Sequence, residues 1–574
     1  MMTFVVLGSV VVLLGLLVWG RVQAYKLFAS LILIYYAFDF ISLESMLGNF
    51  VNTGLITLVF LLLVSTVLEK TRIFASLANW LVTRTQRGTV LRMTGVVGIG
   101  SAFLNNTAMV ATFMSMLGKT KSIAPSKLLI PLSYIAILGG TLTLIGTSTN
   151  LIINSFVVQA GLPELKLFDF LFVGFFLLLF GGLTILALGS RLLPDHPLSE
   201  NQTQAYMIEA KLSDASSLLG LSIEQAGLRH LQDLYLAQVV SGDEVVAPVT
   251  PSYVLKAGDR LLFAGDINVA PKLLLFDGLS FPGGKPVKGN QFVEVVLSHQ
   301  SSMIGSTIKA SRFRNKFDAA VVAIRRGDER LTGRIAEVVL QPGDALVLLT
   351  GPDFSQRENL DKNFYFFSHL EDAQHPLSLK QSVWAVVGFV GVIALAAFEV
   401  LPLLKGLMLL LVVFLLMGLT RVNELRRRMP FEIVMIVGAA LGIAQVMSSQ
   451  GVASLLAETI MGSFGYWGVM GSFIGIYLLT VLLTEMVTNN AAAAVAFPIA
   501  LVTAEALGVS PWPFIFAVAY GASASFLTPY GYQTNLMVYS PGGYKFTDYV
   551  RMGVPVSLVY GLTVILLVPV FFPF

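Results

Sequence analysis

Two polar motifs built from asparagine and threonine lie inside otherwise apolar stretches of the chain. Amide and hydroxyl groups at membrane depth are costly unless they meet a ligand, a cavity or one another. Asparagine offers both a donor and an acceptor, and threonine offers a hydroxyl, so such side chains can contact a cation as well as an anion. The two motifs are Asn105-Asn106-Thr107 and Thr488-Asn489-Asn490.

About 40 residues after each motif the chain has a second polar interruption that ends in Thr-Asn. A helix that breaks at membrane depth exposes N–H groups at one new end and carbonyl groups at the other. The N–H end favours an anion, while carbonyls with Asn and Thr oxygens suit Na⁺. These residues could instead only cap buried helix breaks, but two matching sets favour a transporter site between inverted repeats. The interruptions are Gly146-Thr147-Ser148-Thr149-Asn150 and Thr528-Pro529-Tyr530-Gly531-Tyr532-Gln533-Thr534-Asn535.

Glu485 precedes the second motif, where the first half has Ala102 or Phe103. A carboxyl group in an apolar segment could be a protonatable coupling group. We favour the alternatives that it lies near the outer mouth or is neutralised by N–H groups of a helix end.

The composition restricts the class of protein. The chain has 574 residues, of which 55% are hydrophobic and 12% charged, and its mean hydropathy is +0.77. These values are typical of a polytopic membrane protein. The net charge of +3 is small and dispersed, which argues against nucleic-acid binding. No cysteine is present, so a disulfide or a thiolate metal site is impossible. No Ser-His-Asp, HExxH or Walker pattern occurs, and we predict that the protein is not an enzyme and needs no organic cofactor.

The apolar spans divide the chain into two membrane repeats, residues 1–190 and 379–574. Spans of this length can cross a hydrocarbon core of roughly 30 Å. Segments 92–118 and 468–505 carry the two motifs near their middles, and we interpret both as re-entrant hairpins. The other spans are predicted at 3–20, 27–42, 53–68, 128–157, 168–189, 381–399, 403–419, 431–449, 513–540 and 552–572.

Basic residues predict the orientation. One arrangement places almost every Lys and Arg of the loops on the cytoplasmic side, for example the run Arg426-Arg427-Arg428. It puts both termini outside and the polar insert in the cytoplasm, and it makes the two hairpins enter from opposite faces. We therefore expect a multi-pass protein of the inner (plasma) membrane.

The polar insert, roughly residues 191–378, is a tandem repeat with an offset of 85 residues. The segment beginning at Ser216 recurs at Ser301, and the Gly-Asp turn at Gly258 recurs at Gly343. Alternating strands flank these turns and a helix-like stretch follows the first strand of each copy. We predict two small α/β modules, residues 191–290 and 291–378, that pack on each other.

These motifs and broken helices resemble the divalent anion:sodium symporter family, and the insert is similar to tandem TrkA-C modules. The combination resembles the cyanobacterial and algal sulfate-transporter branch. The resemblance implies a homodimer with elevator-like motion. It implies sodium ligands at Asn105, Asn106, Gly146, Thr488, Asn489 and Thr528. It implies substrate contacts at Asn105, Asn106, Thr107, Thr147, Ser148, Thr488, Asn489, Asn490, Thr528 and Pro529.

The chain departs from the family pattern at two positions. The paired signatures of the family read Ser-Asn-Thr, whereas here Asn105 replaces the Ser and Asn490 replaces the final Thr. These changes are compatible with an inorganic dianion smaller than a dicarboxylate. We therefore expect sodium-coupled symport of sulfate or a similar oxyanion, with a C4-dicarboxylate symporter as the alternative.

The insert alone suggests a third possibility, a ligand-regulated cation transport protein. That reading predicts a TVGYG filter and a nucleotide-binding Rossmann half, and the sequence has neither. Whether the insert binds a small regulatory ligand of nucleotide type or serves only dimerisation stays open at this point.

Overall fold

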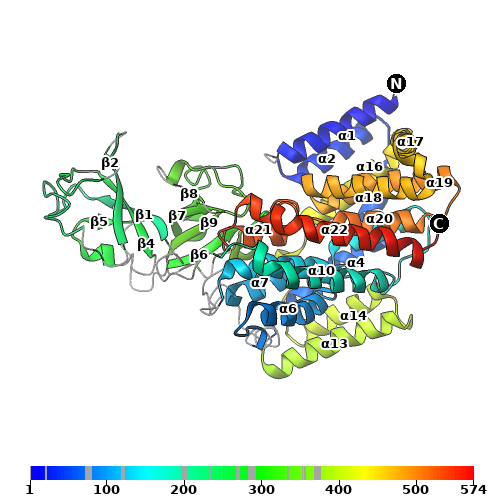
Figure 1. Cartoon of the computed structure of the whole chain (residues 1–574), viewed down its shortest axis with the longest axis horizontal. Helices are drawn as coiled ribbons and strands as arrows, with labels where there is room; N and C mark the ends of the chain where they lie inside the picture. Colours follow the sequence, from blue (N-terminus) through cyan, green and yellow to red (C-terminus); the bar gives the residue numbers. More distant parts are fainter. Residues whose placement is uncertain are drawn as a thin grey trace.

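The computed structural model consists of a helical part and a β-rich insert that projects from one end of it (Figure 1). Both chain termini lie at the end of the helical part that is remote from the insert (Figure 1). The structure describes residues 2–19, 22–71, 80–117, 123–195, 205–228, 231, 234–241, 244–246, 249–266, 272–281, 292–327, 329–331, 335–351, 353–354, 357, 359–366 and 377–574.

The helices of the first half precede the insert and those of the second half follow it. The first half contains α1 (Met2–Trp19), α2 (Ala24–Ala37), α3 (Leu43–Phe50), α4 (Thr53–Glu69), α6 (Gln86–Ser101), α7 (Asn106–Leu117), α8 (Leu129–Gly140), α9 (Ser148–Gln159) and α10 (Leu171–Leu192). The second contains α13 (Leu379–Ala397), α14 (Leu403–Leu416), α15 (Val422–Arg428), α16 (Phe431–Ser449), α17 (Val452–Phe464), α18 (Gly468–Met486), α19 (Asn489–Leu507), α20 (Trp512–Ser523), α21 (Gln533–Tyr539) and α22 (Phe546–Phe571).

The helical part is that of a multi-span membrane protein. Among the described residues, eight helical segments are long and apolar enough to cross a bilayer. Two of the shorter apolar helices, α8 and α20, belong to spans that the sequence predicts as continuous, 128–157 and 513–540. The structure divides each of these spans in two, because the polar interruptions leave the helical path.

Each polar motif interrupts a helix and caps the one that follows. The Asn105 side chain accepts a hydrogen bond from the backbone N–H of Thr107 at 3.0 Å, at the start of α7. The Thr488 hydroxyl accepts the backbone N–H of Ala491 at 3.4 Å, at the start of α19. Asn and Thr are favoured at such positions because their oxygens satisfy N–H groups that lack a partner in the helix.

The downstream breaks are held by one asparagine each. Asn150 Nδ2 donates to the carbonyl of Thr143 at 2.9 Å. Asn535 Nδ2 donates to the carbonyl of Thr528 at 3.2 Å. Both side chains reach back over seven residues, and both are buried. The two halves therefore solve the same problem, an orphaned carbonyl at a helix break, with the same residue at the same spacing.

The two halves interlock around their broken helices. In the first half α6 packs on α8, and in the second half α18 packs on α20. Across the halves α21 lies against α7 and α8, while α9 lies against α19 and α20, and α10 runs beside α22. This packing of one half against the other brings together the four polar segments, which are far apart in the sequence.

The insert contains two antiparallel five-stranded sheets of the same topology. Their strand orders are β3-β2-β4-β1-β5 and β10-β6-β9-β7-β8. The strands of the first are β1 (Ala205–Leu212), β2 (Leu234–Ser241), β3 (Glu244–Val246), β4 (Arg260–Asp266) and β5 (Leu279–Ser280). Those of the second are β6 (Phe292–Leu297), β7 (Ala319–Arg326), β8 (Glu329–Arg330), β9 (Ala345–Thr350) and β10 (Phe364–Phe366).

The 85-residue duplication extends to details of the sheets. The β-bulge between Leu236 and Gln238 has its counterpart between Val321 and Ala323. The isolated bridge from Ser222 to Val254 has its counterpart from Thr307 to Val339. The duplication predicted from the sequence is thus a duplication of backbone geometry.

Within the described residues of the insert, helix is limited to short segments, so the longer helical stretch predicted after the first strand of each copy is not found. The described residues between the first two strands of each copy form mainly turns, and α11 (Phe313–Phe317) has five residues. Ser216 explains why, since its hydroxyl donates to the Asp277 carbonyl at 2.5 Å and accepts the Leu218 N–H at 3.1 Å. Hydroxyls that bond nearby backbone groups favour turns over helix. The predicted boundaries at residues 290 and 378 stay predictions.

The two sheets share apolar contacts. Val322, Ala323 and Val347 of the second copy are buried in the same cluster as the core of the first copy, which includes Ile208 and Phe263. Burial of apolar side chains from both copies in one cluster stabilises their packing.

Candidate functional site

A cavity of about 1350 Å³ lies where the two helical halves meet the insert. Both asparagine motifs and both downstream breaks contribute to its wall. The contributing residues are Asn105, Asn106, Thr107, Gly146, Thr147, Ser148, Thr488, Asn489, Asn490, Tyr530, Gly531, Tyr532 and Gln533. The structure therefore places nine of the predicted binding residues around one space.

The amide of Asn106 connects three of these segments. Its Oδ1 accepts a hydrogen bond from the Ser101 hydroxyl at 2.5 Å, and its Nδ2 donates to the Tyr532 hydroxyl at 2.7 Å. The Tyr532 hydroxyl is also 3.3 Å from the Thr147 hydroxyl. Asn106 is buried, so these bonds fix which side of the amide faces each partner.

The second tip repeats the arrangement of the first. The Thr484 hydroxyl lies 3.0 Å from Asn489 Oδ1 and 2.6 Å from the carbonyl oxygen of Ala522. Thr484 precedes Asn489 by five residues, as Ser101 precedes Asn106. The two tips are thus supported by equivalent hydroxyls.

Further bonds join the two halves across the cavity. The Ser148 hydroxyl lies 3.5 Å from Asn490 Oδ1, and the Thr107 hydroxyl donates to Gln533 Oε1 at 3.2 Å. Each bond pairs a residue of one half with a residue of the other. A change in the position of one half therefore alters the site directly.

Several helices begin at this cavity. Asn106 is the first residue of α7, Ser148 of α9 and Asn489 of α19, and these helices have 12, 12 and 19 residues. The N-terminal end of a helix carries a partial positive charge and unpaired N–H groups. Three such ends at one cavity favour a bound anion, although none of the four polar segments contains Lys or Arg.

Glu485 is neutralised by backbone N–H groups of the second break. Its carboxylate accepts the N–H groups of Phe526 and Leu527 at 2.8 Å each and that of Thr528 at 3.1 Å. The donors belong to non-helical residues that follow α20, whereas the sequence suggested N–H groups of a helix end. Through these hydrogen bonds the carboxylate attaches the second tip to the residues that follow α20.

Two predicted residues do not line the cavity. Thr528 and Pro529 are absent from its wall, and the Thr528 N–H is bonded to Glu485 instead. Thr528, the first residue of the predicted second break, lies three residues before Gly531. Gly146 and Gly531 are 385 residues apart, as are Asn150 and Asn535, so the counterparts of Thr147 and Ser148 are Tyr532 and Gln533.

Tyr532, Gln533, Ser101 and Thr484 were missed because they are not part of the repeated Asn-Thr pattern. The offset of 385 residues between the downstream breaks could have identified the first two. Ser101 and Thr484 share an offset of 383 residues with Asn106 and Asn489, which could have identified them.

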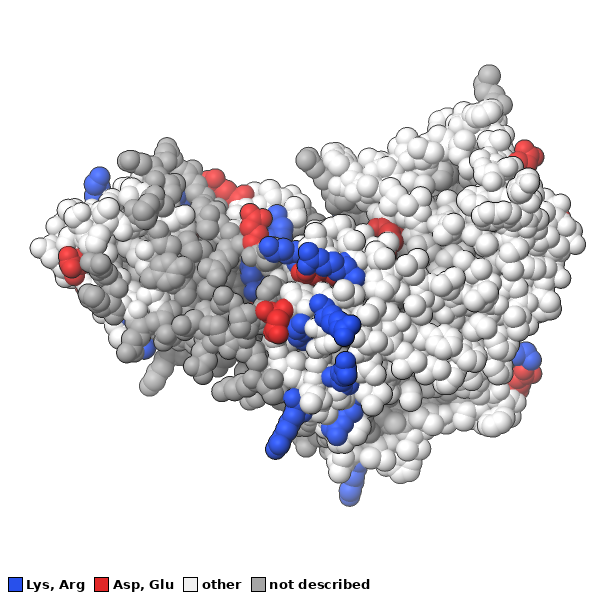
Figure 2. Space-filling model, in the orientation of Figure 1, with Lys and Arg blue, Asp and Glu red and all other residues white. Residues whose placement is uncertain are grey.

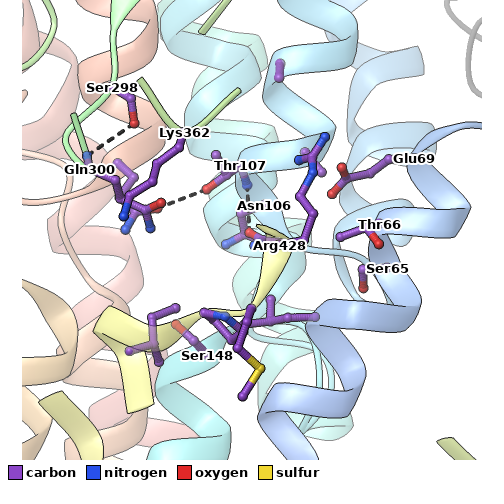
Figure 3. Close-up of a pocket in the computed structure, with 18 of the residues that line it drawn as sticks. Ser65, Thr66, Glu69, Asn106, Thr107, Ser148, Ser298, Gln300, Lys362 and Arg428 are labelled. Carbon is purple, nitrogen blue, oxygen red and sulfur yellow. Dashed lines mark hydrogen bonds between the residues drawn. The ribbon is translucent and has the colours of Figure 1, made fainter. Parts of the chain in front are cut away.

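The mouth of the cavity is charged and is partly formed by the insert. Lys and Arg side chains gather in a band where the insert meets the helical part (Figure 2). Ion pairs there join Lys70 to Glu424 at 2.5 Å and Lys362 of the insert to Glu432 at 3.1 Å. Gln300 and Lys362 lie beside Thr107 in the close-up of the cavity (Figure 3).

Comparison with known proteins gives a consistent set of relatives. Residues 2–521 match a family model described as citrate transporter, CitMHS. The chain is 33% identical over 541 residues to a Chlamydomonas reinhardtii protein named as a candidate sulfur deprivation response regulator, covering 89% of this chain and 92% of that protein. It is 30% identical to an uncharacterized transporter of Synechocystis, with 91% and 89% covered. It is 28% identical to sodium/sulfate cotransporter 1 of C. reinhardtii, with 63% and 42% covered.

Proposed function

Because the chain belongs to the citrate transporter family, we propose that it is a secondary transporter that couples the movement of sulfate, or of a similar inorganic oxyanion, to Na⁺. The convergence of α7, α9 and α19 on one polar cavity carries this proposal. Their N–H groups, with the Asn, Ser and Thr side chains, are donors for an oxyanion.

The absence of Lys and Arg from the four polar segments supports coupling to a cation. A dianion among uncharged donors is stabilised when a cation binds beside it. Carbonyl, amide and hydroxyl oxygens are the ligands that such broken helices offer to Na⁺. We propose Asn105, Asn106 and Gly146 for one sodium site and Thr488 and Asn489 for another, with Gly531 in the place of Gly146. Sodium/sulfate cotransporter 1 of C. reinhardtii is a relative whose name states this coupling.

The position and size of the Tyr532 side chain support the proposal of a small substrate. It stands where the other half has Thr147, and its buried side chain reaches Asn106. A phenol ring in place of a threonine side chain removes space beside the first tip. We infer that the site favours a compact dianion over a longer dicarboxylate.

The description of the family model favours a second candidate, the transport of citrate or a C4-dicarboxylate. Carboxylates and sulfate use the same donors, so size is the feature that separates them. The uptake experiment below includes both classes as competitors.

We propose further that the helical halves are inverted repeats with re-entrant hairpins at both tips and that the protein works as an elevator-type homodimer. The repeated Asn caps and tip hydroxyls support the internal repeat. The basic band at the insert end supports an inner-membrane protein with a cytoplasmic insert and external termini.

The proposal is tested by uptake of labelled sulfate into proteoliposomes, with and without an inward Na⁺ gradient. Unlabelled sulfate, succinate and citrate are the competitors. We expect sodium-dependent uptake that sulfate blocks and the carboxylates do not. Block by succinate or citrate alone would assign the protein to carboxylates, and uptake independent of Na⁺ would refute the sodium sites.

A further inference from the structure

The second copy of the insert is fastened to the helix that forms one side of the binding cavity. Ser540 follows α21 directly, and its side chain is fully buried. The Ser540 hydroxyl accepts the backbone N–H of Gly327 at 3.0 Å and donates to the carbonyl of Gly343 at 2.6 Å. One hydroxyl therefore uses both its donor and an acceptor to hold two turns of the insert.

The shape of the two turns depends on glycine. Gly327 and Gly343 have φ angles of 58° and 83°, which other residues adopt at a cost. An added Cβ would lie 2.8 Å from the ring of Tyr539 at Gly327, and 2.7 Å from the side chain of Leu536 at Gly343. At the counterpart turn of the first copy, Gly258, an added Cβ would meet nothing within 4 Å. Close packing against α21 is thus a property of the second copy.

The same copy also contacts the other helices around the cavity. Strand β10 packs against α7, which begins with Asn106. Lys362, which lines the cavity, pairs with Glu432 at 3.1 Å, at the start of α16. The copy therefore contacts two groups of helices: α7 with α21, and α16, which begins at the cavity wall and packs against α19.

Alternating access requires the helices around a binding site to move relative to one another. A body that is fixed to both groups opposes such movement unless one of its contacts opens. We propose that the second copy of the insert is an intramolecular clamp that limits the rate of transport, with Ser540 as its contact to the site helices and the Lys362–Glu432 pair as its contact to α16. The clamp rests on the proposed transport function.

The first test removes the Ser540 contact. We expect Ser540→Ala to raise the initial rate of uptake about threefold or more, with the KM for substrate little changed. Hydrogen exchange of the Gly327 amide, which needs no substrate, should become faster in the same variant. Ser557→Ala is the matched control, since among the described residues the buried Ser557 hydroxyl has no hydrogen-bond partner.

The second test locks the other contact. The chain has no cysteine, so Lys362→Cys with Glu432→Cys introduces the only two thiols. We expect this variant to transport faster than the wild type, to lose at least tenfold in rate when a short cleavable bismaleimide joins the two thiols, and to recover when the linker is cleaved.

Two results would overturn the clamp. One is wild-type uptake by the cross-linked protein, and the other is unchanged or reduced uptake by Ser540→Ala while Gly327 exchanges faster. If the wild type transports none of the anions, the proposed transport function is refuted, and this result leaves the docking of the insert on α21 to be tested by itself. The exchange of Gly327 then decides the docking itself, because a fast amide in the wild type would show that the contact does not form.

Discussion

At the scale of single residues, the Asn106 side chain is held from both sides. Both ends of its amide are engaged, with Ser101 on one side and Tyr532 on the other. We expect Asn106→Ala to abolish sodium-dependent uptake, and the same for Asn489→Ala at the second tip. The purified variants should keep a normal elution volume, since each change removes only one polar group. Wild-type-like uptake by either variant would refute the assignment of the tips.

Tyr532 provides a test of size selection. Tyr532→Phe keeps the ring and removes the hydroxyl that contacts Asn106. Tyr532→Thr copies the residue of the other half and opens space. We expect the phenylalanine variant to bind sulfate more weakly with unchanged preference, and the threonine variant to admit succinate. Competition of succinate with labelled sulfate measures both, and equal competition in the two variants would contradict a role in size selection.

We expect His299 to make the insert sensitive to acid. Its Nδ1 lies 2.6 Å from the Tyr365 hydroxyl, and burial lowers the pKa of His299 to about 4. The unfolded chain takes up a proton near pH 6.5 and the folded insert does not, so the stability of the second copy should fall as the pH drops from about 6.5 to about 4. Hydrogen exchange of β6 and β9 at pH 7 and pH 5 measures this. His299→Gln should remove most of the difference, and an unchanged difference would exclude His299 as its source.

At the scale of elements, the second broken helix depends on a carboxylate that the first one lacks. Three consecutive N–H groups after α20 are bonded to Glu485. We expect Glu485→Gln to lower the free energy of unfolding by about 1–3 kcal/mol, because the amide replaces an acceptor with a donor that faces these groups. Thermal unfolding in detergent measures the effect. Glu505→Gln, at an exposed position near the end of α19, is the control and should have little effect.

Most of the long apolar helices and the approximate positions of the breaks could be predicted from the sequence, whereas α3 and α17 fall in no predicted span. Runs of apolar residues gave the spans, and the Asn-Thr motifs gave the interruptions, because both depend on local composition. The residues that face the cavity after the second break could not be predicted in the same way. Whether Thr528 or Tyr532 lies in the wall depends on how α20 and α21 pack against the other half, which no local pattern records.

In the insert, too, local patterns predict the elements but not the contacts between distant segments. Its duplication and its strands followed from alternation and repeated turns, and these predictions were confirmed. The contact of Ser540 with Gly327 and Gly343 joins positions that are about 200 residues apart or more, and Ser540 has no distinguishing neighbour in the sequence. Such a contact is visible only once the fold brings the two turns to α21.

At the scale of the whole molecule, the orientation in the membrane can be tested without background, since the chain has no cysteine. Tyr466 is 97% exposed in the 3₁₀ helix Gly465–Trp467 before α18, and Leu275 is 84% exposed in the insert. We expect an impermeant maleimide applied to intact cells to label Tyr466→Cys, and Leu275→Cys only after permeabilisation. The reverse pattern would place the insert outside.

Deletion of the insert separates its possible roles. We expect a chain that lacks residues 200–370, closed by a short linker, to keep a folded membrane part, because the helical halves contact each other directly. Size-exclusion chromatography with light scattering measures its mass. Loss of a dimer would assign dimerisation to the insert, whereas a retained dimer would leave the proposed clamp and a ligand of nucleotide type as its roles.

The constant 85-residue offset has a consequence for the history of the protein. The two copies have diverged in most side chains, yet both bulges and both isolated bridges keep the same spacing. The spacing between these features is therefore the same in both copies, with no net gain or loss of residues, although most side chains differ. After the ancestral duplication, one copy could specialise in holding α21, and the other was left to acquire a different task. Related proteins that descend from the same duplication should differ in the residues of the exposed turns of the first copy. The length of each copy should vary less among them.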